Sequence, residues 1–165
     1  MQIAIGRSGA VAARPAVTHA SRPVVLTAAA LSLLAGWVHL AYVAPHMRAW
    51  WLYGLFFLAV GLGQGVLAAL LIRWPQPWVA LAGIAMNAGV VVMYVMTRSG
   101  GVPFGPHAGV VEKAKTIDLL TTASEVAIIV LLLLLLGRRA TRVAVNVVLV
   151  LGVLLWVARL TETMP

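Results

Sequence analysis

The stretch from Arg98 to Glu125, RSGGVPFGPHAGVVEKAKTIDLLTTASE, lies between long runs of apolar sequence. It holds both lysines of the chain and three of its four carboxylates, in a context rich in glycine and proline. The segments on either side are long and apolar enough to cross a bilayer as helices. This contrast predicts an all-α integral membrane protein with one substantial polar connection.

The composition excludes a water-soluble domain. The chain has 165 residues, of which 62% are hydrophobic and 10% charged, whereas soluble domains carry about 25% charged residues. The formal charge of +8 is spread over short loops, where basic residues orient helices and contact anionic headgroups. We therefore expect the lipid bilayer as a partner and no nucleic acid. The absence of cysteine excludes disulfides and thiolate metal sites.

Five segments reach the roughly 20 apolar residues that a transmembrane helix needs: about 24–44, 51–72, 77–97, 118–136 and 143–160. They predict one transmembrane domain over residues 24–160, a five-helix bundle with an outer loop at 98–117 and a short tail at 161–165. We expect the first helix to end at Ala44, because helices usually end at or before the residue preceding a proline. The residues His46 to Ala49 would then be a short loop.

Residues 1–23 carry three arginines among small residues and show no hydrophobic period, which predicts a disordered cytoplasmic tail. A cleavable signal peptide is the alternative. It is less favoured because the positive region is long and the segment Tyr42-Val43-Ala44 has a bulky side chain where cleavage needs a small one. The densest basic cluster, at 138–142, would lie inside. The positive-inside bias therefore places the N-terminus in the cytoplasm and the C-terminus outside.

Small residues at helical spacing predict close helix contacts. Gly61 and Gly65 form a GxxxG pattern in the second predicted span, and Ala85 and Gly89 have the same spacing in the third. One interpretation is a homo-oligomer, or a membrane-protein partner, bound through Gly61 and Gly65. The alternative is packing within the five-helix bundle, which is favoured.

Ionisable residues gather in the predicted outer half of the membrane. Asp118, Thr121 or Thr122, and Glu125 follow one another at helical spacing, so they share one helix face. A carboxylate in hydrocarbon is costly, so Glu125 should point into the bundle as a candidate functional group. The alternative is a structural, protonated Glu125 bonded to Gln64 or Asn87. The candidate ligand- or proton-binding residues are His39, Gln64, Asn87, His107, Asp118 and Glu125.

A divalent metal is a further hypothesis, because imidazole and carboxylate ligands suit Zn(II), Cu(II), Ni(II) or Fe. The candidate ligands are His39, His46, His107 and Glu112. Their spacing matches no compact motif such as HExxH, so they could converge only through tertiary structure; otherwise they are interfacial residues. Bis-histidine haem ligation is not expected, because only His39 is predicted at membrane depth.

The segment 100–109 is too rich in glycine and proline for a helix and too apolar for a solvated linker. We expect a structured cap over the outer mouth of the bundle, with a plain extracytoplasmic loop as the alternative. No Walker loop, dinucleotide-binding glycine pattern, GxSxG elbow or HExxH motif occurs. A Ser-His-Asp set could be assembled from Ser99 or Ser124 with His107 and Asp118, but nothing in the spacing favours it.

The pattern HxxxxxPHxxxWWLYGLFF at 39–57 and the segment RSGGVPFGPHAGVVE at 98–112 are followed by Asp118 and Glu125. Over about residues 30–136 this arrangement resembles a group of small multipass membrane proteins from actinobacteria. The resemblance implies a bacterial plasma-membrane location and supplies no catalytic residues.

Three functions follow from the sequence, in order of preference. The first is binding or transport of a cation, proton or small ligand through an outward-facing polar pocket. The second is a non-catalytic accessory subunit of a larger membrane complex. The third and least favoured is a membrane-embedded metal-dependent enzyme.

Overall fold

A computed structural model describes residues 22–136, 141–143, 145–146 and 149–150, and its named elements over these residues are all helices. The helices are α1 (Arg22–Ala41), α2 (Val43–Ala49), α3 (Trp51–Arg73), α4 (Pro77–Ser99) and α5 (Thr116–Leu135). Four of them, α1, α3, α4 and α5, are long and apolar enough to span a membrane. An all-helical fold with four candidate membrane spans is therefore confirmed over the described residues. The predicted tail 1–23, the fifth span 143–160 and the end 161–165 lie largely or wholly outside the described residues.

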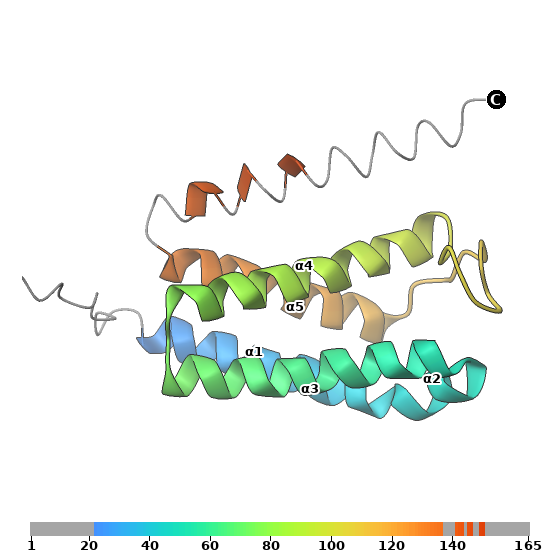
Figure 1. The fold of residues 1–165 in the computed structure, drawn as a ribbon, viewed down its shortest axis with the longest axis horizontal. Coiled ribbons are helices and arrows are strands. Elements are labelled where there is room, and N and C mark those ends of the chain that lie inside the picture. Colours follow the sequence, from blue (N-terminus) through green and yellow to red (C-terminus); the bar gives the residue numbers. More distant parts are fainter. Residues whose placement is uncertain (1–21, 137–140, 144, 147–148, 151–165) are drawn as a thin grey trace, which may run out of the picture.

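The four long helices run alternately up and down (Figure 1). Helix α1 packs against α3 and α5, and α4 packs mainly against α5. The start of α1, the short α3–α4 turn at 74–76 and the end of α5 lie at one end of the bundle. Helix α2 and the connection 100–115 lie at the other, here named the loop end.

The predicted boundary of the first helix was wrong. Helix α1 ends at Ala41, and the expected loop His46–Ala49 is part of α2. Pro45 does not end a helix here, because it lies in the first turn of α2, where its missing N–H would have no intrahelical acceptor anyway. The chain breaks instead at Trp50, whose extended backbone (φ −167°, ψ 137°) separates α2 from α3.

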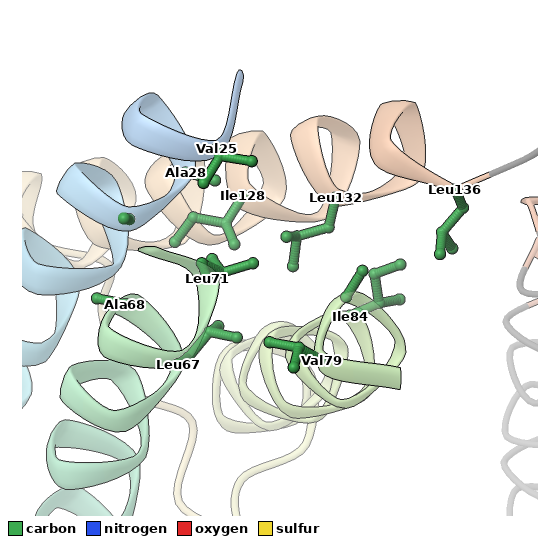
Figure 2. Packing of buried hydrophobic residues seen from close by; sticks show 12 residues of the cluster. Val25, Ala28, Leu67, Ala68, Leu71, Val79, Ile84, Ile128, Leu132 and Leu136 are labelled. Atoms are coloured by element: carbon green, nitrogen blue, oxygen red, sulfur yellow. The ribbon is translucent and has the colours of Figure 1, made fainter. Parts of the chain in front are cut away.

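A close-packed apolar cluster fills the end of the bundle opposite the loop end. It draws side chains from α1, α3, α4 and α5 (Figure 2). Its largest fully buried members, Leu71, Ile128 and Leu132, are at most 1% exposed. Such packing approaches the density of an organic crystal. A small apolar cavity of about 120 Å³ lies beside the cluster between α3 and α4, whereas the larger of the two cavities lies toward the loop end.

Gly61 is used for packing inside the chain. A Cβ added to it would lie 2.7 Å from Cγ of Leu40, and one added to Gly36 would lie 3.0 Å from the main-chain oxygen of Gly61. The absence of side chains therefore lets α1 and α3 approach closely. A Cβ added to Gly65 would meet nothing within 4 Å. For Gly61 the structure thus shows the intramolecular alternative, whereas an outward contact through Gly65 stays a prediction.

Candidate functional site: a cavity at the loop end

The most deeply buried ionisable contact joins α1 to α5. Nε2 of His39 lies 2.8 Å from Oε1 of Glu125, and the two side chains are 7% and 1% exposed. The predicted orientation of Glu125, into the bundle, is therefore confirmed. Its partner differs from the expected amides, because α1 packs directly against α5 and brings the imidazole to the carboxylate.

The chemistry of this pair follows from its burial. An uncompensated carboxylate in hydrocarbon is costly, and the imidazole of His39 supplies the polar partner that Glu125 needs there. Which of the two atoms donates depends on the tautomer of the ring. Among the described residues the buried Nδ1 of His39 has no hydrogen-bond partner.

His39 and Glu125 line a cavity of about 870 Å³ at the loop end. The cavity is bounded by α1, α2, α3, α4, α5 and the connection between α4 and α5. Asp118, Thr121 and Thr122 line it together with Glu125, which confirms that these residues share one face of α5. A volume of this size falls within the range of small-molecule sites.

The connection 100–115 is folded against the helices. The N–H of Gly109 donates to the carbonyl of Val102 (2.9 Å), and positive φ at Gly101 (76°) and Gly109 (72°) reverses the chain. The hydroxyl of Tyr53 on α3 donates to the carbonyl of Phe104 (2.9 Å). The expected structured cap is therefore present over the loop end. Its position on the outer side of the membrane stays a prediction.

Arg98, near the end of α4, forms ion pairs with both the connection and the start of α5. Its guanidinium donates to Glu112 (2.8 Å) and to Asp118 (2.7 Å), and it lies 4.9 Å from the ring centroid of Tyr94. Asp118 also accepts the main-chain N–H of Lys115 at the start of α5 (3.0 Å). Sequence reasoning did not single out Arg98. Its signal was a basic residue at the C-terminus of a span, followed by the carboxylates Glu112 and Asp118.

The two other described histidines, His46 and His107, have partners other than His39. Nδ1 of His46 bonds the carbonyl of Tyr42 (2.8 Å), and its ring stacks on Phe57 with centroids 3.8 Å apart. His107 stacks against Tyr53 in the connection. Over the described ranges, no three or more His, Asp or Glu side chains are grouped to hold a metal ion. The metal hypothesis with His39, His46, His107 and Glu112 therefore stays a prediction without geometric support.

The two predicted mid-membrane amides form a separate network. Nε2 of Gln64 donates to Oδ1 of Asn87 (2.9 Å), and the hydroxyl of Ser32 donates to Gln64. Nδ2 of Asn87 donates to the carbonyl of Gly83 (2.8 Å). Ser32, Gln64 and Asn87 are fully buried. This network ties α1, α3 and α4 together, which is the structural role that the sequence had assigned to a Glu125–amide contact.

Comparison with protein-family models, with curated proteins and with solved structures found no match. The resemblance to actinobacterial membrane proteins stays a prediction.

Proposed function

We propose that this protein binds a small molecule in the cavity at the loop end, with the His39–Glu125 pair as the polar contact at its inner end. The buried pair, whose two residues both line the cavity, carries this proposal. Proton-linked binding or transport is the natural extension of the proposal, because imidazole and carboxylate groups both exchange protons.

Binding is favoured over conduction by the shape of the bundle. The apolar cluster around Leu71, Ile128 and Leu132 fills the opposite end, so the cavity ends inside the protein. A bare cation is a weaker candidate ligand, because Glu125 is already paired with His39 and Asp118 with Arg98.

The topology belongs to the same proposal. We place the N-terminus in the cytoplasm and the cavity toward the outside of a bacterial plasma membrane, in a chain with a fifth span at 143–160. The distribution of basic residues supports this arrangement. A reporter fused after Gly109 or after Trp74 distinguishes it from the inverted topology, because only one of the two connections would face the cytoplasm.

The proposal is tested by identifying what the protein retains when it is extracted into discs of native lipid. Small molecules and metals would be measured by mass spectrometry and elemental analysis for wild type, His39→Ala and Glu125→Gln. The matched control is Ser124→Ala, next to Glu125 on α5, because the Ser124 hydroxyl bonds only the carbonyl of Leu120 on its own helix.

We expect wild type and the control to retain a compound near stoichiometric amounts and both pair variants to lose it. Equal contents in all four folded proteins would contradict the proposal. A retained metal would restore the metal-dependent alternatives, enzyme included.

An accessory subunit is the second candidate, because α4 presents small residues outward. Ala85 and Gly89 are exposed, and a Cβ added to Gly89 would meet nothing within 4 Å among the described residues. A partner helix, or a second copy, could approach closely there. Crosslinking in native membranes tests this candidate. Gly89→Leu should abolish a specific crosslinked species, and Gly65→Leu should leave it unchanged. Loss of the species in Gly65→Leu instead would assign the contact to α3.

A further inference from the structure

We propose that an anionic membrane lipid binds the loop-end cavity from its side, with an acyl chain between α3 and α4 and its charged head beside Lys113 and Lys115. This inference goes beyond the proposed function, because the lipid uses the α3–α4 side of the cavity. The His39–Glu125 pair, which joins α1 to α5, is left to the small molecule. Three features of the described residues carry the inference: an uncovered wall, its apolar lining and two cations at its mouth.

Helices α3 and α4 part toward the loop end. In the middle of the bundle they are joined by the hydrogen bond from Gln64 to Asn87 (2.9 Å). Closer to the loop end, side chains within 52–59 of α3 and 90–97 of α4 line the cavity. Leu55, in this wall, is 42% exposed, so the protein does not cover it. Because α3 and α4 are both candidate membrane spans, the uncovered wall between them faces hydrocarbon.

The lining of this wall suits an acyl chain. The stretches 52–59 and 90–97 each extend over seven residue steps, which is about 10 Å along a helix axis. Most of the side chains that line them are apolar, among them Leu52, Leu55, Phe56, Val90 and Met93. A polar molecule would lose its hydrogen bonds to water against such a wall, whereas a hydrocarbon chain has none to lose.

Two lysines at the mouth of the cavity carry charge that the described residues do not neutralise. Lys113 and Lys115 both line the cavity and are exposed. The carboxylates that line it are already paired with other groups: Glu112 and Asp118 with Arg98, and Glu125 with His39. Within the described part of the chain, neither lysine has an ion-pair partner. An anionic head beside them is therefore attracted by two unpaired ammonium groups.

The position of the lysines distinguishes a lipid head from a free anion. Helix α5, a candidate span, begins at Thr116, directly after Lys115, so the lysines lie where the span enters the membrane. Phe104 and Val110 line the same mouth and are 48% and 53% exposed. A free anion would leave these apolar side chains and the α3–α4 wall uncovered. A lipid satisfies the charge and covers the apolar surface in one molecule.

The test is native mass spectrometry of the full chain released from micelles that contain either phosphatidylglycerol or phosphatidylcholine with identical acyl chains. We expect wild type to bind the anionic lipid at least tenfold more tightly. Each lysine should contribute about fivefold, which corresponds to about 1 kcal/mol. Lys113→Gln/Lys115→Gln should therefore bind the two lipids about equally. The matched control is Arg48→Gln, which removes an exposed positive charge at the loop end outside the cavity lining and should keep the preference.

The wall and the head have separate controls. Leu55→Trp would fill the wall and should weaken binding of both lipids about tenfold. Leu62→Trp, on the same helix but outside the cavity lining, should leave binding unchanged. Both residues are exposed, so both variants should fold. Glycerol phosphate, a head without chains, should not displace the anionic lipid.

The outcomes separate this inference from the proposed function. Equal binding of the two lipids by wild type, or a preference lost equally in Arg48→Gln, would overturn the inference. Displacement by glycerol phosphate would overturn it in favour of a free anion. Glu125→Gln should keep the lipid preference, and loss of the preference there would overturn the separation of the two sites. Equal binding of the two lipids, in a protein that still loses a small molecule in His39→Ala, would leave the proposed function standing.

Discussion

Replacing His39 by leucine should destabilise the bundle because it leaves Glu125 buried without a partner. The contact spans 2.8 Å between side chains that are 7% and 1% exposed. Interhelical hydrogen bonds in membranes contribute about 0.6–2 kcal/mol, and an unsatisfied buried polar group costs about 1–3 kcal/mol. We therefore expect His39→Leu to lower the free energy of unfolding by about 2–5 kcal/mol.

The double variant His39→Leu/Glu125→Leu should recover most of that loss. Replacing both members of a buried polar pair by apolar residues is often neutral or stabilising. We expect its free energy of unfolding to lie within about 1 kcal/mol of wild type, and the variant to fold but retain no ligand. That combination separates a binding role from a purely structural one.

The assay is reversible unfolding in mixed micelles, applied as a double-mutant cycle to wild type, both single variants and the double variant. Thr121→Val is the matched control, because its hydroxyl bonds only the carbonyl of Ile117 one turn earlier on α5. A coupling energy below about 0.5 kcal/mol, within the usual error of additivity, would refute the reasoning. So would a double variant that retains the ligand of wild type.

Three further predictions concern the scaffold around the cavity. Gly61→Leu should lower the free energy of unfolding by about 1–3 kcal/mol, because its side chain would collide with Leu40. Gly65→Leu should leave the free energy of unfolding unchanged, because there is open space at its Cβ. Equal losses for the two variants in the same unfolding assay would contradict the packing. Arg98→Gln should change global stability by about 1 kcal/mol or less, since its partner Glu112 is 52% exposed, yet should speed amide hydrogen exchange across 100–115; unchanged exchange would show that the ion pairs do not hold the connection. Gln64→Leu should cost about 1–3 kcal/mol because it removes the donor to the buried Oδ1 of Asn87, whereas Ser32 keeps the main-chain carbonyl of residue 64. A variant as stable as wild type would show that this network adds nothing.

Helical periodicity and hydrophobic length were enough to predict most of the fold. They located four of the spans within a few residues and the shared face of Asp118 and Glu125. They failed at Pro45, because the rule that proline ends a helix does not apply in a first turn. A single sequence has no signal that α2 begins immediately after α1. Nor does it show that the chain leaves helical geometry at Tyr42 and at Trp50, the two residues that flank α2.

The partners within the site could not be predicted, because they come from distant segments. His39 and Glu125 are 86 positions apart, and their contact depends on α1 packing against α5. For the same reason the sequence could not show that Glu125 pairs with His39 and that Gln64 bonds Asn87. The structural contact expected between Glu125 and an amide is made between the two amides. The predicted depth in the membrane identified which polar side chains need a hydrogen-bond partner. The packing of the helices determines which residue that partner is.

The most direct test of the account is nitrogen NMR of histidine-labelled protein in lipid bilayers, with His39 assigned by comparison with His39→Phe. The account predicts a change in the ring-nitrogen resonances of His39 when the retained ligand is added. Resonances that stay fixed while the ligand binds would contradict the claim that the His39–Glu125 pair is the polar contact of the cavity.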